Sequence, residues 1–161
     1  LLLYRAVELI AQRRLHRHGI DPANIQPACF PAECNDEQRL LKAVNQRLEQ
    51  IPWFRYEYAV LPKRAGLVLA YVLLDVLRDP ILEGMDIKEI ANRAEVRNHS
   101  WLVHGFNATD GEQYARFEKT ARRLADAFFR LEGLHLNEWL ERATFVQPGG
   151  LSTAPTGSST P

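Results

Sequence analysis

The sequence of 161 residues is 46% apolar and carries 20 basic and 20 acidic side chains, a composition typical of one globular domain with an apolar core. A net charge of zero excludes a protein that coats nucleic acid through bulk electrostatics, although a local basic site stays possible. The longest apolar run, GLVLAYVLLDVL, is interrupted by Asp75 and is shorter than the roughly 20 residues that cross a bilayer, so no membrane partner is expected.

The start of the chain and its cysteines indicate the cellular setting. The first residue is leucine and the chain opens inside an amphipathic pattern, which indicates a piece of a longer polypeptide. The opening LLLYRAVELIAQRRL mixes arginines into its apolar stretch and has no cleavage site, unlike a signal peptide. Cys29 and Cys34 lack a second pair for zinc and are interpreted as free thiols in a reducing compartment. We expect a cytoplasmic protein without a metal or cofactor.

Hydrophobic periodicity predicts helices separated by loops rich in proline or glycine. Asn35 with Gln38, and Asp86 with Glu89, have the spacing of capping boxes, and Pro62 suits the first turn of a helix. The expected helices cover about residues 1–18, 35–51, 62–78, 86–104 and 110–131.

The remaining segments complete the prediction of the fold. The helix at 62–78 is apolar almost all round, which is typical of a central position. The aromatic stretch PWFRYEYAVLP (52–62) fits either a loop or an irregular helix, and LHLNEWLERATF (134–145) fits a short extension packed on the bundle. With no alternation of strands and helices, the prediction is an all-α bundle of about five helices over residues 1–146, followed by a flexible low-complexity tail at 147–161.

The stretch RNHSWLVHG (97–105) gives the fourth helix a stripe of polar side chains near its end. At about 100° per residue, positions seven apart differ by about 20° around a helix, so Arg97 and His104 share a face, with Arg93 and Ser100 along the same stripe. The apolar face lies about a quarter-turn away. It is predicted to consist of Ile87, Ala91, Ala94, Trp101 and Leu102.

An arginine beside a histidine is suited to the cleavage of a phosphodiester. The guanidinium of Arg97 matches phosphate oxygens, and the imidazole of His104 can give or take a proton near neutral pH. RNA supplies its own nucleophile, the 2′-hydroxyl, so that a protein need only orient the phosphate, stabilise charge and move protons.

The spacing alone is not specific, because other arginines precede histidines by five or six residues. Arg97 and His104 differ from these pairs in sharing one capped helix and one face, with a glycine directly after the histidine. The competing pairs are Arg13 with His18, Arg93 with His99, and Arg130 with His135. The first two diverge around their helix, and the third straddles Gly133.

RNHSWLVHG matches the R-x(4–6)-H signature of HEPN (higher eukaryotes and prokaryotes nucleotide-binding) domains. Its RN-x-S-x-x-x-HG-F form resembles the CARF–HEPN ribonucleases of type III CRISPR systems, and LLLYRAVELIAQRRL…HGID resembles the start of their C-terminal helical region. The resemblance extends over most of residues 1–145.

The resemblance implies a metal-independent endoribonuclease for single-stranded RNA that leaves a 2′,3′-cyclic phosphate, in antiviral defence. By position, Arg97 and His104 correspond to the catalytic pair and Asn98 to the polar residue that supports the arginine. Such enzymes are homodimers with a composite site, switched on by cyclic oligoadenylate at an N-terminal Rossmann-like CARF sensor. Nothing in these 161 residues has the pattern of that sensor, so we expect it upstream in the full-length protein.

Structural roles remain open for the same residues. Asn98 fits a buried amide, Ser100 either a substrate contact or a bond to the preceding helical turn, and Trp101 a core, interface or base-stacking side chain. Arg93 fits either a phosphate contact or an ion pair with Glu89. The segment WFRYEY, followed by Lys63 and Arg64, fits a core insert or a surface for single-stranded RNA.

Two other functions stay open beside the leading hypothesis. One is a HEPN toxin-type ribonuclease controlled by an antitoxin, which would use the same chemistry under a different regulator. The other is a helical dimerisation or nucleotide-binding module without catalytic activity.

Overall fold

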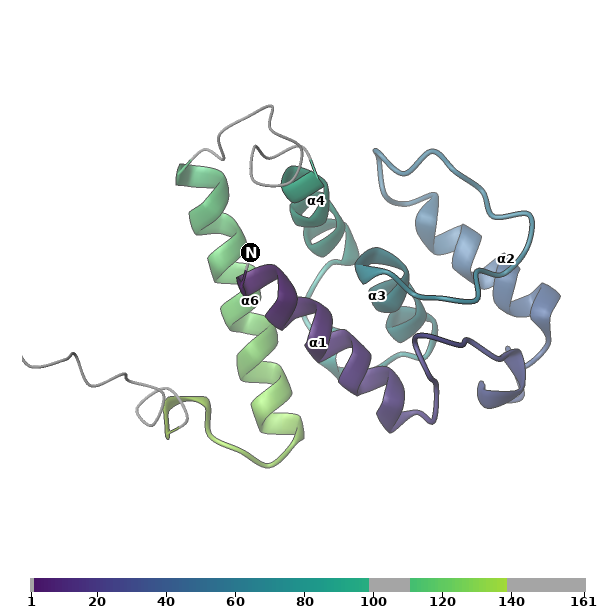
Figure 1. The fold of residues 1–161 in the computed structure, drawn as a ribbon, viewed down its shortest axis with the longest axis horizontal. Coiled ribbons are helices and arrows are strands. Elements are labelled where there is room, and N and C mark those ends of the chain that lie inside the picture. Colours follow the sequence, from purple (N-terminus) through teal and green to yellow (C-terminus); the bar gives the residue numbers. More distant parts are fainter. Residues whose placement is uncertain (1, 99–110, 139–161) are drawn as a thin grey trace, which may run out of the picture.

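The computed structural model describes residues 2–98 and 111–138, and this part of the chain is helical with no strand. Figure 1 shows the helices arranged as a bundle, which confirms the predicted all-α fold. The α-helices are α1 (Leu2–Arg17), α2 (Glu37–Leu48), α3 (Leu67–Val76), α4 (Ile87–Asn98) and α6 (Gly111–Leu131). Short 3-10 turns, η1 (Pro27–Cys29) and η2 (Pro80–Leu82), lie in the connections. The predicted tail at 147–161 is outside the described residues.

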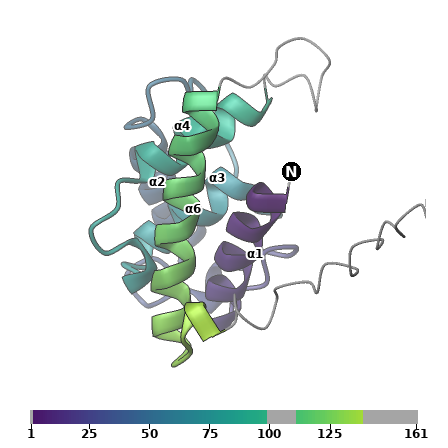
Figure 2. The ribbon, with the colours of Figure 1, turned by 90° about the vertical axis from the view of Figure 1, so that its left-hand side faces the viewer.

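Helix α3 is the centre of the bundle, as its apolar sequence predicts. It packs against α1, α2 and α4, and α6 covers α1 and α4 (Figures 1 and 2). Its Tyr71 is completely buried, and the hydroxyl donates a hydrogen bond to the carbonyl oxygen of Val7 in α1 at 2.8 Å. A buried hydroxyl is retained in a core when it has such a partner. Burial raises the pKa of Tyr71, so the phenol stays neutral.

Two predicted helix starts are wrong, for different reasons. Asp36 rather than Asn35 caps α2, and its carboxylate accepts from the backbone N–H of Arg39 at 3.0 Å. Helix α3 begins at Leu67 rather than at Pro62. The intervening backbone pairs with the loop after α1 instead: the N–H of Ile25 donates to the carbonyl of Lys63, and that of Ala65 to the carbonyl of Pro22, both at 2.8 Å.

The ends of α1 and α2 lie within three residues of the predicted ends. Helix α1 ends at Arg17, just before Gly19, which adopts a positive φ of 75°. Helix α2 ends at Leu48, three residues before the predicted end, because residues 49–51 form a tighter turn. The aromatic stretch at 52–62 is a loop, one of the two predicted alternatives. Cys29 and Cys34 are free, as predicted.

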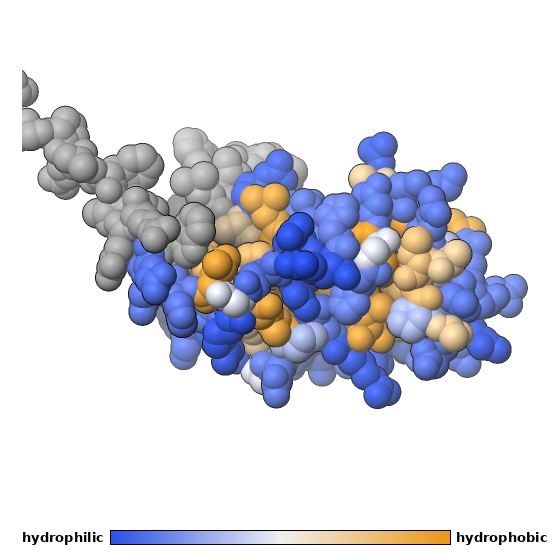
Figure 3. All heavy atoms as spheres, turned by 90° about the horizontal axis from the view of Figure 1, so that it is seen from below, coloured by the Kyte–Doolittle hydropathy of each residue, from blue (hydrophilic) through white to orange (hydrophobic). Residues whose placement is uncertain are grey.

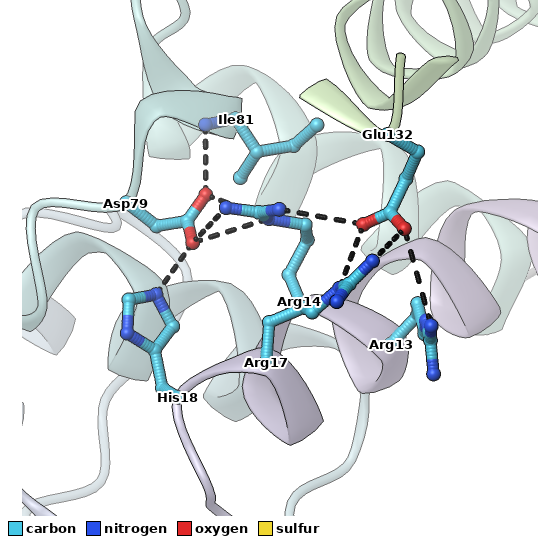
Figure 4. A network of polar contacts seen from close by, with 7 residues as sticks. All are labelled: Arg13, Arg14, Arg17, His18, Asp79, Ile81 and Glu132. Atoms are coloured by element: carbon cyan, nitrogen blue, oxygen red, sulfur yellow. Dashed lines mark hydrogen bonds and ion pairs between the residues drawn. The ribbon is translucent and has the colours of Figure 1, made fainter. Parts of the chain in front are cut away.

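A buried carboxylate joins the end of α1 to the turn after α3 (Figure 4). Asp79, whose side chain is fully buried, accepts from Nη2 of Arg14 at 3.0 Å and from the N–H of Ile81 at 2.8 Å, and lies 2.6 Å from Nε2 of His18. Burial by itself raises the pKa of Asp79, but the hydrogen bonds from Arg14, Ile81 and His18 and the charge of Arg14 outweigh it, so that the pKa is lowered.

A second carboxylate extends this network to the end of α6 (Figure 4). Glu132 accepts from Nη2 of Arg17 at 2.6 Å, and its oxygens lie 3.6 Å from Nη1 of Arg14 and 3.9 Å from Nη2 of Arg13. The hydrogen bond from Arg17 is the main reason why the pKa of Glu132 is lowered. Asp79 and Glu132 thus tie α1, η2 and α6 together at one end of the bundle.

Acidification is expected to remove the contribution of Asp79 to stability. A carboxylate whose folded pKa lies below its unfolded pKa, about 3.9 for aspartate, stabilises the fold above the unfolded value and loses this effect as the pH falls through the folded value. The free energy of unfolding should therefore differ between wild type and Asp79→Asn by a constant amount down to about pH 5 and by less below about pH 4. Urea unfolding at pH 5.5, 4.5, 3.5 and 3.0 measures this, and an unchanged difference at pH 3.0 would contradict it.

One face of the bundle is mostly hydrophilic (Figure 3). Figure 3 shows the face seen from below in Figure 1, where hydrophilic side chains surround smaller apolar areas. No helix within residues 2–98 and 111–138 has the length and apolar character needed to cross a membrane.

Candidate functional site

Helix α4 carries the first part of the predicted site. Its start is capped by Asp86, whose Oδ1 accepts from the N–H of Lys88 at 2.8 Å. Ile87, Ile90 and Ala91 are buried, which confirms the predicted apolar face at Ile87 and Ala91 and adds Ile90 to it. The first turn of α4 is therefore fixed in the core, and its later turns extend from that anchor.

Glu89 connects α4 to α6 instead of closing a capping box. Its Oε1 accepts from the hydroxyl of Thr120 at 2.7 Å, and its Oε2 lies 3.4 Å from Nη1 of Arg123. Nη2 of Arg123 also donates to the carbonyl of Gly84 at 2.7 Å. Gly84, just before α4, contacts Arg123, whereas Glu89, later in the chain, contacts Thr120, which is earlier in α6. Helices α4 and α6 are therefore antiparallel neighbours. The predicted back-bond from Glu89 to its own helix start is wrong, because α6 offers the carboxylate two partners.

The backbone of α4 includes three of the predicted site positions. Position 97 follows Ile90 by seven residues and lies about 20° from it around the helix axis, and position 93 follows Glu89 by four residues, about 40° away. Position 93 thus continues the side of α4 on which Glu89 contacts α6, and position 97 continues the line of the buried Ile90. Asn98 is the last residue of α4. Ser100, Trp101 and His104 are outside the described residues, so the pairing of Arg97 with His104 stays a prediction.

The end of α4 and the start of α6 lie at the same end of the bundle (Figures 1 and 2). The first turns of α6 present the ion pair of Glu112 with Arg116 and the exposed ring of Tyr114. A ligand held at the end of α4 would therefore also meet a charged and aromatic surface from α6.

The competing pair Arg13 and His18 takes part in the network of ion pairs around Asp79 and Glu132. Arg13 faces Glu132, with 3.9 Å between Nη2 and Oε2, whereas Nε2 of His18 lies 2.6 Å from Oδ2 of Asp79. The two side chains thus contact different carboxylates, which is consistent with the predicted divergence.

The competing pair Arg130 and His135 is split by the end of a helix. Helix α6 ends at Leu131 and Gly133 has a positive φ of 71°, as its predicted role as a break requires. Both exposed side chains line a groove of about 560 Å³, together with the carboxylates of Glu83 and Asp126. Arg123 also lines the groove, so the two carboxylates balance the two guanidinium groups there.

The described residues contain no cluster of three or more histidine, cysteine or acidic side chains arranged to hold a metal ion.

Comparison with known proteins identifies the family of the chain. The family model of the Csm6 HEPN domain matches residues 1–127, a range that includes Arg97, Asn98 and His104. No curated protein and no solved structure matches. Because the match spans most of the chain, the chain belongs to the Csm6 HEPN-domain family of CRISPR-associated proteins.

Proposed function

We propose that this chain is the metal-independent endoribonuclease domain of a CRISPR-associated defence protein and cleaves single-stranded RNA. The observation that carries the proposal is the family match over residues 1–127, since HEPN domains are generally ribonucleases. It is also consistent with the helical backbone of α4, whose range includes positions 93, 97 and 98 and whose first turn is buried.

Arg97 and His104 carry out the reaction in this proposal. The guanidinium of Arg97 binds the scissile phosphate and stabilises its growing negative charge. The 2′-oxygen attacks phosphorus and forms the cyclic phosphate while the bond from phosphorus to the 5′-oxygen breaks. One His104 imidazole accepts the 2′-proton, and the imidazolium of the second His104 donates a proton to the leaving 5′-oxygen. In this proposal Asn98 and Ser100 support the catalytic pair, and Arg93 and Trp101 are the candidate RNA contacts.

The proposed active form is a homodimer. One imidazole cannot easily serve both proton transfers from one protonation state, whereas two chains related by a two-fold axis bring two Arg97 and two His104 side chains to one phosphate. In the full-length protein, we expect an upstream CARF sensor that binds cyclic oligoadenylate to control this site in the cytoplasm.

Cleavage of a labelled single-stranded RNA in excess chelator tests the activity. The expected result is cutting that persists without metal and leaves a 2′,3′-cyclic phosphate and a 5′-hydroxyl. Size measurement by analytical ultracentrifugation in the same buffer tests the dimer. A dimer that cuts no RNA, in this chain and in a version extended to include the upstream sensor and its ligand, would favour a module without catalytic activity.

A further inference from the structure

The loop between α2 and α3 carries a row of aromatic side chains that ends in solvent. In segment 54–58, the ring of Phe54 lies 6.2 Å from that of Tyr56 and 6.1 Å from that of Tyr58, so the rings of these alternate residues lie close together. Phe54 and Tyr58 are half-buried, whereas Tyr56 is 78% exposed. Apart from its edge contact with Phe54, the large ring of Tyr56 is left to solvent.

The row is held in place by the rest of the fold. The side chain of Asn45 in α2 donates to the carbonyl of Tyr58 at 2.9 Å and accepts from its N–H at 3.0 Å. At the other end of the row, the backbone N–H of Phe54 donates to the carbonyl of Ile51 at 3.0 Å. Because both ends of segment 54–58 are fixed, the backbone that carries Tyr56 is held in place, and less conformational entropy is lost when a ligand stacks on its ring.

The charge around the row fits a polyanion. Residues 53–64 contain three cations, Arg55, Lys63 and Arg64, and one carboxylate, Glu57, in a chain whose net charge is zero. All three cations are exposed, and none has an ion-pair partner in the described part of the chain. Aromatic rings interleaved with exposed cations are the combination that binds single-stranded nucleic acid without base-pair readout.

The loop also lies on the side of the molecule where a substrate would pass. The segment that follows α2 reaches the same end of the bundle as the end of α4 (Figures 1 and 2). A single strand with its scissile phosphate near the end of α4 can therefore extend toward this loop.

We propose that residues 53–58 form a second contact surface for the single-stranded RNA substrate, with a base stacked on Tyr56 and a phosphate bound by Arg55. This inference rests on the proposed ribonuclease function and adds to it a binding surface apart from the reacting groups. The surface binds RNA by stacking and charge, so it raises affinity for strands long enough to reach it without contributing to bond cleavage.

The test measures binding of a fluorescent single-stranded RNA by anisotropy, with His104→Ala as the background to prevent cleavage. Adding Tyr56→Ala is expected to weaken binding by about 5- to 100-fold, the loss for one stacked base, while Tyr56→Phe keeps the ring and binds like the parent. Val60→Ala removes a side chain that is 71% exposed in the same loop and should change nothing. Arg55→Ala should reduce the slope of log K against log salt by about 0.7, and Tyr56→Ala should leave that slope unchanged.

Kinetics on the active protein separate this inference from the function on which it rests. With His104 intact, Tyr56→Ala should raise KM for a long RNA with kcat unchanged, and should leave cleavage of a two-nucleotide substrate unaffected. A wild type that cleaves no RNA, both as this chain and in the version extended to include the upstream sensor and its ligand, overturns the proposed function and this inference with it. A wild type that cleaves RNA while Tyr56→Ala binds normally overturns this inference alone. A change of oligomeric state with RNA binding preserved would do the same, because it would assign Tyr56 to a protein contact.

Discussion

Replacing His104 with alanine is expected to reduce cleavage of single-stranded RNA by about 10²- to 10⁴-fold, the range that positioned acid–base groups contribute, so that turnover falls close to background. In the proposed dimer, the substitution removes both imidazoles at once, and neither proton transfer keeps a protein partner. Single-turnover cleavage with protein in excess measures the effect, because it isolates the chemical step from product release.

Arg97 has a different role, and its variants should show it. Arg97→Ala removes the phosphate ligand and should lower cleavage to a similar level. Arg97→Lys keeps the charge but loses the planar fork of donors, so it should restore only part of the rate.

Matched histidines control for nonspecific effects. His99→Ala changes the same segment at a position about 160° from Arg97 around the predicted helix, and His135→Ala changes an exposed histidine beyond α6. Both should cleave like wild type, and circular dichroism should show the same helix content for every variant. Undiminished cleavage by His104→Ala in a preparation free of other nucleases would contradict the assignment of His104 as a catalytic residue.

The helices were predictable because their signal is local. Spacing of apolar residues depends only on neighbours along the chain, and it correctly identified α3 as the central helix and Leu131 as the end of α6. The choice of Asn35 over Asp36 as the cap of α2 failed because both side chains can accept the same bond and the sequence does not rank them.

Contacts between distant segments were not predictable from one sequence. Helix α3 starts later than predicted because residues 63–65 form backbone hydrogen bonds with residues 22–25. No pattern of neighbouring residues predicts these bonds. Glu89 had a suitable spacing for a capping box, yet Thr120 and Arg123, more than thirty residues away, contact its carboxylate. In the same way, the predicted end of the third helix at about residue 78 did not indicate that Arg14 and His18 would converge on Asp79.

The candidate site shows the same difference between local spacing, which could be predicted, and contacts between distant segments, which could not. Arg93, Arg97 and His104 could be grouped because they fall within one predicted helix, where spacing converts directly to an angle. The exposed ring of Tyr56 depends on Asn45 holding the loop, and a composite dimer site depends on a second chain. Neither relation is encoded in the spacing of neighbouring residues.

Removing the carboxylate of Asp79 is expected to cost about 3–5 kcal/mol of the free energy of unfolding in Asp79→Ala, a large share of the stability of a domain of this size. The variant leaves the guanidinium of Arg14, only 11% exposed, without its principal partner, and it also removes the acceptor for the N–H of Ile81. Chemical denaturation at pH 7 measures the loss. Asp79→Asn should cost less than Asp79→Ala, because its amide oxygen can still cap η2.

The same chain supplies a matched control four residues away. Asp75 pairs with Arg47, but these side chains are 34% and 37% exposed, so Asp75→Ala should cost no more than about 1 kcal/mol. Equal losses at the two aspartates would contradict the argument, because burial is the main difference between the pairs. Combining Asp79→Ala with Arg14→Leu should recover part of the stability, since the uncompensated buried charge is then gone.

The position of this network makes stability and activity separable. The lower ends of α1 and α6 in Figure 1, where Asp79 and Glu132 join them, are opposite to the end where α4 finishes. Asp79→Ala should therefore lower the denaturation midpoint while leaving single-turnover cleavage near wild type at a temperature where both proteins are folded. His104→Ala should lower single-turnover cleavage while leaving the denaturation midpoint near that of wild type. If Asp79→Ala instead abolished cleavage in a folded protein, the network would have to act on the geometry of α4 through α3 and α6, the two helices that pack against it.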